Sequence, residues 1–194
     1  GAAFAFYPNK QITTGEGGAI TTNDEAIARK LRLIRSHGRS QGDYFNSSGS
    51  PDYTTLGYNF RIPTLCAALG ISQLHKIEKI IKMRREIASR YGKALTGLPG
   101  LGLPKESHDC RHVYQLYSII LNTHEMQKGL KSHLEGKGIM SKVYFDPVHL
   151  SKHYQDQYGD MRGMFPVTED VSSRILTLPL FPGIKDKDFN RITG

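Results

Sequence analysis

A single lysine, Lys10, lies between an aromatic stretch and a run of threonine and glycine in FAFYPNKQITTGEGG, near the start of the chain. A lysine amine can form a Schiff base with an aldehyde, but it must first lose its proton, which requires a desolvated site or a neighbouring cation. Such a lysine must also be held in place. The alternating Phe4 and Phe6 predict a strand before it, and Pro8 fixes φ just upstream. The pattern makes Lys10 the first candidate for covalent chemistry.

Other clusters could hold a phosphate or a metal ion. TTGEGG is glycine-rich but lacks G-x-x-x-x-G-K-[ST], so its spacing alone predicts a tight connection between strands, with positive φ at Gly15, Gly17 and Gly18. HDCRH and HLSKH bring histidine and cysteine together. Neither has the C-x2-4-C or HExxH spacing of a zinc site, so we predict no metal.

The composition bounds the partners of the chain. A net charge of +8 over 194 residues could indicate nucleic-acid binding, but the basic residues are spread along stretches such as KIEKIIKMRREIASR, and no nucleic-acid fold signature accompanies them. A basic surface also suits a phosphorylated or nucleotide-linked small substrate. Two cysteines, Cys66 and Cys110, are too few for a disulfide framework and favour the reducing cytoplasm. No apolar run reaches the ~18 residues of a membrane span.

The elements around Lys10 alternate between strand and helix, which predicts an α/β or α+β fold. We expect a second strand at GGAITT, then a helix capped by Asn23 with Ile27, Leu31 and Ile34 on its buried face and its end at Gly38. Beyond it, we expect a long polar loop over 39–53 and a helical region from Pro63 to Gly97, with a break or a close helix contact at Gly70. We expect strands at 112–121, 139–145 and 176–180. Further helices should begin at a cap formed by Asn122 or Thr123 and cover 168–176 and 185–194.

Both ends of the chain have the pattern of an interrupted structural element. No initiator Met precedes the opening strand pattern, and the final helical pattern stops after about two turns, too short to be stable alone. We therefore expect the chain to be part of a longer protein.

The lysine segment resembles that of the DegT/DnrJ/EryC1/StrS family of pyridoxal-phosphate-dependent sugar aminotransferases, whose pattern there is approximately F-S-F-[FY]-x-x-K-x-[IL]-T-x-G-E-G-G. Six further stretches resemble the family and occur in the family's order: RSHG, GYNFR, AALGISQL, YFDPVH, FPVTE and LPLFPG. Together they cover essentially the whole chain.

The resemblance implies an α/β fold of the aspartate-aminotransferase-like kind, fold type I among pyridoxal-phosphate enzymes. Residues 1–61 would form the last part of the large cofactor-binding domain, and residues 62–194 would form the small C-terminal α+β domain. The parent protein would convert a keto-sugar nucleotide to an amino-sugar nucleotide for a polysaccharide or natural product, with glutamate as amino donor. It would be a homodimer with shared active sites.

The resemblance also implies roles for five residues. Lys10 would form the Schiff base with pyridoxal phosphate and shuttle a proton, while Asn59 would reach across the dimer interface to the phosphate of the partner subunit's cofactor. Arg61 would lie near the substrate, and Tyr144 and His149 would line the sugar side of the pocket. The alternative for each of the last four is a capping or solvent-exposed residue.

The chain departs from the family pattern in three respects. Ala5 stands where the family often has a phosphate-binding Ser, and Thr64 and Cys66 stand where an acidic residue and Gln are usual. The family's Asp partner of the pyridine nitrogen lies upstream of the lysine, so we expect the chain alone to be inactive. Two alternatives stay open. A sugar dehydratase of the same fold typically has His in place of Lys10, and a non-catalytic regulatory or binding protein would tolerate Ala5.

Overall fold

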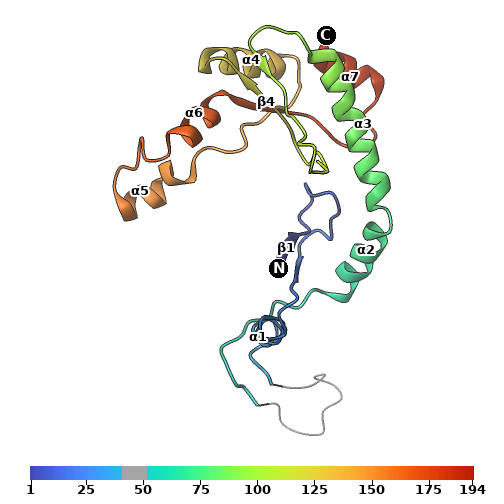
Figure 1. The fold of residues 1–194 in the computed structure, drawn as a ribbon, viewed down its shortest axis with the longest axis vertical. Helices are drawn as coiled ribbons and strands as arrows, with labels where there is room; N and C mark the ends of the chain where they lie inside the picture. Colours follow the sequence, from blue (N-terminus) through green and yellow to red (C-terminus); the bar gives the residue numbers. More distant parts are fainter. Residues whose placement is uncertain (41–51) are drawn as a thin grey trace. The chain divides into compact units, whose positions relative to one another are not determined.

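The chain divides into two compact units in the computed structural model, which describes residues 1–40 and 52–194. The units are Gly1–Ile77 and Glu78–Gly194 (Figure 1). Most of the polar loop expected over 39–53 lies outside the described residues. The expected boundary between two domains after residue 61 stays a prediction.

The first unit contains β1 (Ala2–Ala5), β2 (Gly18–Thr21), α1 (Glu25–Arg35) and α2 (Thr64–Leu74). The second contains nearly all of α3 (Ile77–Leu95), followed by β3 (Leu101–Gly102), β4 (Tyr117–Leu121), α4 (His124–Gly136), the 3₁₀ helix η1 (Val148–Leu150), α5 (Lys152–Tyr158), α6 (Pro166–Arg174), β5 (Ile175–Leu178) and α7 (Asp186–Thr193).

The first unit is built on an antiparallel pair of strands. β1 pairs with β2 in a register that places Ala2 opposite Thr21, and all eight residues of the pair are exposed. A two-stranded sheet of this kind is marginal by itself. Among the described residues, β1 and β2 pair only with each other, so each strand presents a free edge.

Helix α1 begins one residue later than the sequence indicates. Asp24 is its N-cap, and the Asp24 carboxylate accepts hydrogen bonds from the backbone N–H groups of Ala26 and Ile27, so the prediction of Asn23 was wrong. Aspartate and asparagine cap equally well, and periodicity cannot choose between neighbours. The predicted burial of the apolar stripe was also wrong, because α1 has no buried residue and Ile27 is 50% exposed.

Pro63 precedes α2, as expected, but the helical region does not break at Gly70. The interruption lies at His75 and Lys76, between α2 and α3. The other expectation, a close helix contact at Gly70, is met in part: a Cβ there would lie 3.0 Å from the Thr14 side chain, which belongs to the connection between β1 and β2 and not to a second helix. α3 ends at Leu95, close to the predicted stop at Gly97, which has φ +84°.

The second unit has its own hydrophobic core. Its sheet has the order β3-β4-β5 with antiparallel pairing throughout. One face carries Tyr117, Ile119 and Leu176, each at most 2% exposed, and these side chains share one core with buried residues of α3, α4 and α7. Tyr91 of α3 stacks on Tyr117 at 4.7 Å between ring centroids and meets Phe189 of α7 at 4.8 Å. These aromatic contacts join the helices to the sheet.

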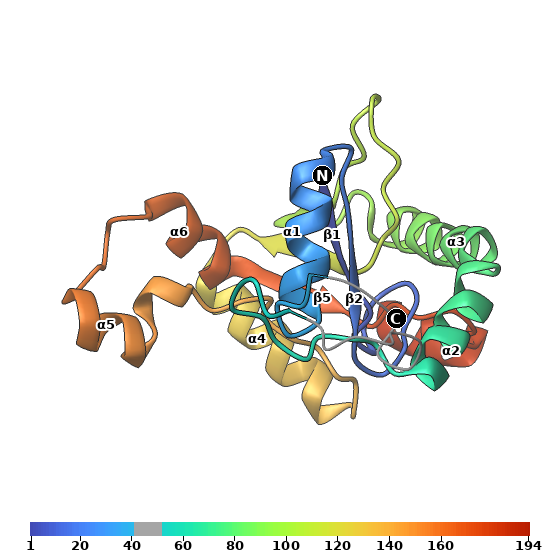
Figure 2. The same cartoon turned by 90° about the horizontal axis from the view of Figure 1, so that it is seen from below.

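Two predicted strands differ from the structure. Only residues 117–121 of the expected strand 112–121 form β4. The strand expected over 139–145 is wrong, because its pairing is limited to an isolated bridge between Lys142 and Thr177. No sequence pattern predicted η1 and α5, which lie in an excursion away from the sheet (Figure 2). Of the two predicted caps of α4, Thr123 accepts the backbone N–H of Met126 and is the N-cap.

Among the described residues, no helix is both long enough and apolar enough to cross a membrane.

Candidate functional site

Lys10 lies in the connection between β1 and β2, which is closed at its base by backbone pairing. Phe6 N–H donates to Gly17 O at 2.9 Å, and Thr14 N–H donates to Phe6 O at 3.0 Å. Within the connection, Lys10 N–H donates to Tyr7 O at 3.0 Å. The lysine is half-buried, with Ile12 and Thr14 buried near it in sequence. A strand pair and a hydrogen-bonded turn therefore fix the backbone that carries the lysine.

The glycines after Lys10 serve two different purposes. Gly15 and Gly17 have φ of +82° and +137°, as the sequence indicates, whereas Gly18 does not have positive φ. A Cβ at Gly18 would lie 2.6 Å from Phe4 O, so Gly18 permits close approach of the two strands. A Cβ at Gly17 would lie 2.9 Å from Thr14 Oγ1, which shows how tightly the turn packs.

Asn59 and Arg61 follow a segment that pairs with the C-terminal end of α1. Tyr58 N–H donates to Ile34 O at 2.7 Å, and Phe60 N–H donates to Arg35 O at 2.9 Å. Both Asn59 and Arg61 are exposed. The stretches RSHG and GYNFR, which were separate motifs in the sequence, are therefore one local structure.

A groove of about 1060 Å³ opens in the first unit, and Arg61 is one of its lining residues. Apolar residues line most of it, from β1, β2, α1 and the segment around Phe60, together with Arg32, Arg35, Arg61 and Glu16. Three guanidinium groups against one carboxylate make the groove electropositive. Lys10 and Asn59 are not among the residues that line it.

Tyr144 and His149 belong to the second unit, where both are partly buried. His149 Nε2 lies 2.9 Å from Glu169 Oε1, and the imidazole packs against the ring of Phe165 at 4.8 Å. Tyr144 makes an edge contact with Phe145. His149 is thus held by a carboxylate and an aromatic ring from α6 and its N-cap.

Glu169 was not identified as the partner of His149 from the sequence, although FPVTE was noted as a motif. Its carboxylate accepts from His149 and also from the backbone N–H of Gly163, at 2.9 and 3.1 Å. The hydrogen bond from His149, followed by that from Gly163, holds the pKa of Glu169 below its usual value. Because the ionised carboxylate can only accept, Nε2 of His149 carries a proton, and in the neutral ring Nδ1 is an acceptor.

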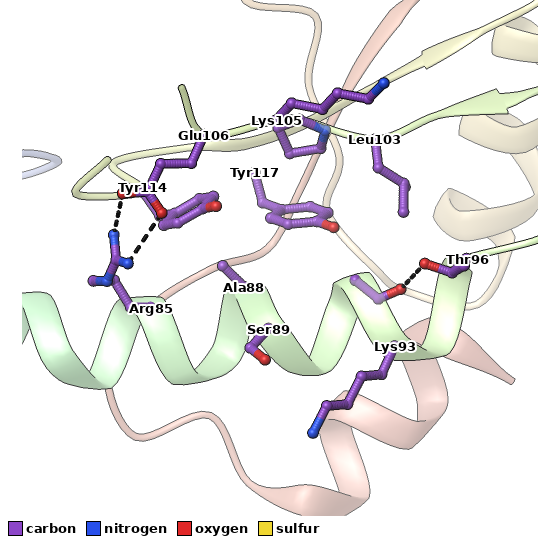
Figure 3. Close-up of a pocket in the computed structure, with 12 residues that line it drawn as sticks. Arg85, Ala88, Ser89, Lys93, Thr96, Leu103, Lys105, Glu106, Tyr114 and Tyr117 are labelled. Carbon is purple, nitrogen blue, oxygen red and sulfur yellow. Dashed lines mark hydrogen bonds and ion pairs between the residues drawn. The ribbon is translucent and has the colours of Figure 1, made fainter. Parts of the chain in front are cut away.

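A second groove, of about 760 Å³, lies in the second unit between α3 and the segment that follows β3 (Figure 3). Figure 3 shows the Arg85–Glu106 ion pair at one end of it and the rings of Tyr114 and Tyr117 above the helix. None of the five residues expected at the site lines this groove. Within the described ranges, 1–40 and 52–194, no group of three His, Cys, Asp or Glu side chains is arranged to hold a metal ion.

Comparison with known proteins gives consistent results. Residues 1–194 match the DegT/DnrJ/EryC1/StrS aminotransferase family. The spore coat polysaccharide biosynthesis protein SpsC of Bacillus subtilis (strain 168) is 37% identical, with 98% of this chain and 51% of SpsC covered. GDP-perosamine synthase of Escherichia coli O157:H7 is 35% identical, with coverage of 96% and 48% respectively.

Solved structures show the same relationship. The aminotransferase PseC of Helicobacter pylori, involved in the biosynthesis of pseudoaminic acid, has a TM-score of 0.87 at 27% identity and covers 98% of this chain and 50% of its own. DesV of S. venezuelae has a TM-score of 0.86 at 30% identity, with coverage of 98% and 49%. The chain spans about half the length of the curated relatives it matches.

Proposed function

Because the chain belongs to the DegT/DnrJ/EryC1/StrS aminotransferase family, we propose that the protein carrying it transfers an amino group to a keto-sugar nucleotide, with pyridoxal phosphate as cofactor. Its fold is the α/β fold type I of pyridoxal-phosphate enzymes. Glutamate is the amino donor that the family resemblance implies. The relatives include a polysaccharide biosynthesis protein and a GDP-perosamine synthase, which supports a nucleotide sugar as substrate and polysaccharide biosynthesis as the setting.

The placement of Lys10 carries the proposal, because it is a half-buried lysine on a turn closed by the β1–β2 pair. A sugar dehydratase of this fold would typically have His at that position, so Lys10 favours amino transfer. Retention of the amine also argues against a protein that has lost its chemistry.

The residues near Lys10 fit the cofactor. Pyridoxal phosphate is an aldehyde that a primary amine can hold covalently. The side-chain nitrogen of the adjacent Gln11 is buried and, among the described residues, has no hydrogen-bond partner. A buried donor of this kind needs an acceptor, and a phosphorylated cofactor offers several. When bound, the cofactor supplies an electron sink for the carbon that gains or loses the proton.

The chain's own residues then have distinct tasks. Lys10 Nζ attaches the cofactor and afterwards takes and returns the proton that moves during amino transfer. The Asn59 amide donates to the phosphate of the cofactor in the partner subunit, and Arg61 pairs with a phosphate of the nucleotide sugar. Tyr144 and His149 bind sugar hydroxyls, His149 through the acceptor Nδ1 that its bond to Glu169 leaves.

The proposed homodimer is supported by an apolar run on the first unit. Leu56, Phe60 and Leu65 are 75%, 65% and 86% exposed, and the Tyr58 ring stacks on that of Phe60 at 4.8 Å. Exposed apolar side chains concentrated in one short stretch are typical of an interface. A twofold-symmetric contact through this run would bring Asn59 to the neighbouring subunit.

We place the protein in the cytoplasm. Both cysteines, Cys66 and Cys110, are free thiols, which suits a reducing compartment.

Reduction with borohydride in the presence of pyridoxal phosphate tests the function. In the complete protein, mass mapping should find the reduced cofactor on Lys10, and sedimentation of the same sample should show a dimer. Lys10→Arg is the matched control, because it keeps the charge and length but cannot form the bond. Label on another lysine, with Lys10 unmodified, would contradict the assignment.

A further inference from the structure

The turn after α1 determines where the Asn59–Arg61 segment lies. Ser36 is the C-cap of α1, and its backbone forms an antiparallel bridge with Asn59. The next residue continues the pairing, because His37 N–H donates to Tyr58 O at 2.9 Å. The backbone of Ser36 thus lies directly opposite the residue proposed to reach the cofactor.

The side chain of Ser36 contacts Arg61, the second candidate residue of this segment. Its Oγ accepts a hydrogen bond from Arg61 Nη1 at 2.9 Å. Ser36 is half-buried while Arg61 is exposed, so the serine is the fixed partner and the arginine is the long side chain being held. One residue therefore contacts both candidates, Asn59 through backbone and Arg61 through its hydroxyl.

The electrostatics of the groove explain why an anchor is needed. Arg61 shares the lining of the groove with Arg32 and Arg35, and Glu16 is the carboxylate among its lining residues. Repulsion among three guanidinium groups favours conformations in which the exposed Arg61 side chain moves away. A hydrogen bond to Ser36 opposes that movement.

The anchor is neutral, and this matters for binding. A carboxylate partner would hold Arg61 more strongly but would cancel its charge, whereas a hydroxyl leaves the charge intact. A guanidinium has five N–H donors, so one bond to Ser36 leaves donors for the bidentate pairing that phosphate favours.

We propose that Ser36 is a positioning residue that holds the Arg61 guanidinium ready for a phosphate of the nucleotide sugar. The proposal rests on the proposed function for the identity of the ligand. It adds a residue from the RSHG stretch, twenty-five positions before Arg61, to the apparatus for substrate binding. Ser36 acts through Arg61 and does not itself touch the substrate.

Steady-state kinetics of the complete, cofactor-loaded protein test the coupling. Ser36→Ala should raise KM for the nucleotide sugar roughly 3- to 10-fold, in the range of couplings between contacting residues, with kcat changed less than about twofold. Ser36→Thr keeps a hydroxyl and should restore KM. In an Arg61→Ala background, Ser36→Ala should have no further effect. Additive effects in the double variant, or an equal loss of kcat, would overturn the proposal.

A second measurement does not depend on activity. The ¹⁵N relaxation of the Arg61 guanidinium in the cofactor-free protein should show greater mobility in Ser36→Ala than in the wild type or Ser36→Thr. Ser40→Ala is the matched control, because the Ser40 hydroxyl donates to Asp52 O in the same unit. If no sugar nucleotide is aminated at all, the proposed function fails, and relaxation still decides the anchor. Unchanged relaxation in Ser36→Ala would refute the anchor whatever the activity.

Discussion

Two adjacent arginines on α3 have different structural roles, because one is buried and the other is partly exposed. Arg84 is 7% exposed, and its Nη1 donates to the carbonyl oxygens of Tyr114, Gln115 and Leu180. Burial lowers the pKa of Arg84. Arg85, about 100° around the helix, is partly exposed and pairs with Glu106. Arg84 therefore joins α3 to the segments next to β4 and β5, while Arg85 holds a surface loop.

Replacement of the buried arginine should be costly. Arg84→Met should lower the free energy of unfolding by about 2–4 kcal/mol, because three carbonyl groups lose their donor inside the protein. Arg85→Met is the matched control and should cost much less, since its ion pair is open to water. Urea denaturation of both variants of the complete protein measures the difference. Equal losses would show that Arg84 is not a structural clamp.

The Arg85–Glu106 pair gives the second unit a dependence on pH. The two N–H groups that Arg85 donates, followed by the backbone N–H of His112, lower the pKa of Glu106 from 4.5 to about 2. A lowered carboxyl pKa stabilises the folded state fully above the unfolded value, and the stabilisation is lost as pH falls through the folded value. The affected window runs from about pH 4.5 down to about pH 2.

Glu106→Gln should therefore flatten the acid side of the stability profile. The difference in unfolding free energy between wild type and variant should be constant above about pH 5 and shrink towards pH 2. Denaturant titrations at several pH values measure it. Glu78→Gln is the comparison, because the hydrogen bond from Arg111 also lowers the pKa of Glu78, but Glu78 lacks the backbone donor that Glu106 has and its side chain is 70% exposed, so the change with pH should be smaller. A difference that does not change with pH would contradict the assigned pKa.

At the residue scale, the sequence identifies a reactive residue more readily than it identifies the side chain that this residue contacts. Lys10 is recognisable because strand, proline and glycine signals surround it. Glu169 could not be paired with His149 from the sequence, since twenty residues and an irregular excursion separate them. The burial of Arg84, by contrast, could have been predicted from the sequence. Arg84 follows Ile81 by three positions and precedes Ala88 by four, so it lies on the apolar stripe of the helix, where a charge is unexpected.

At the scale of elements, two glycines allow the end of α1 and the Asn59–Arg61 segment to meet. A Cβ on Gly38 would lie 1.7 Å from Thr55 O, and a Cβ on Gly57 would lie 2.0 Å from Gly38 N. Gly38 also has φ +73°. Backbone packs directly on backbone here, and no side chain fits between.

Gly38→Ala should disrupt this contact. We expect a loss of at least about 2 kcal/mol, because the new methyl group adds a clash with a carbonyl oxygen to the strain of positive φ. Gly92→Ala is the control. Gly92 lies within α3 with no atom within 4 Å of the added Cβ, so alanine there should gain about 0.5–1 kcal/mol. Thermal unfolding of the two variants of the complete protein should move in opposite directions. A neutral Gly38→Ala would mean that the contact is not needed.

Long elements were predicted well and short ones were not. The apolar period of α3 continues over 19 residues and leaves little ambiguity. β3 has two residues and carries no pattern of its own, because its partner β4 determines it. Residues 139–145 have the composition of a strand, yet their bridge to a strand is the isolated one between Lys142 and Thr177. Pairing depends on neighbours that a local pattern does not describe.

At the scale of the whole molecule, the two units differ in how much apolar surface they bury. In the described part of the first unit, Ile12 is the one hydrophobic side chain that is buried. The second unit holds a continuous core from α3, the sheet, α4 and α7. The curated relatives are about twice as long as this chain, so their remaining half would offer the surface that the strand pair and α1 lack.

This difference predicts unequal protection in the 194-residue chain by itself. Backbone amides in β4 and β5 should exchange with deuterium only on unfolding of the whole unit, because both strands lie in the core. Amides in β1 and β2 should exchange quickly, since a two-stranded sheet with every residue exposed has little to stabilise it. Because the same strand pair carries Lys10, pyridoxal phosphate should be lost from this chain on dialysis. Exchange followed by mass spectrometry of peptides, with cofactor absorbance after dialysis, measures both.

Ile119→Ala provides the control for that experiment. Ile119 is 1% exposed in the core of the second unit, and its truncation should cost about 2–5 kcal/mol. Exchange should then accelerate in β4 and β5 together, because they belong to one cooperative unit, and should not change in β1 and β2. Slow exchange in β1 and β2 of the wild-type chain, or stoichiometric cofactor retained by it, would show that the lysine segment is stable without further polypeptide.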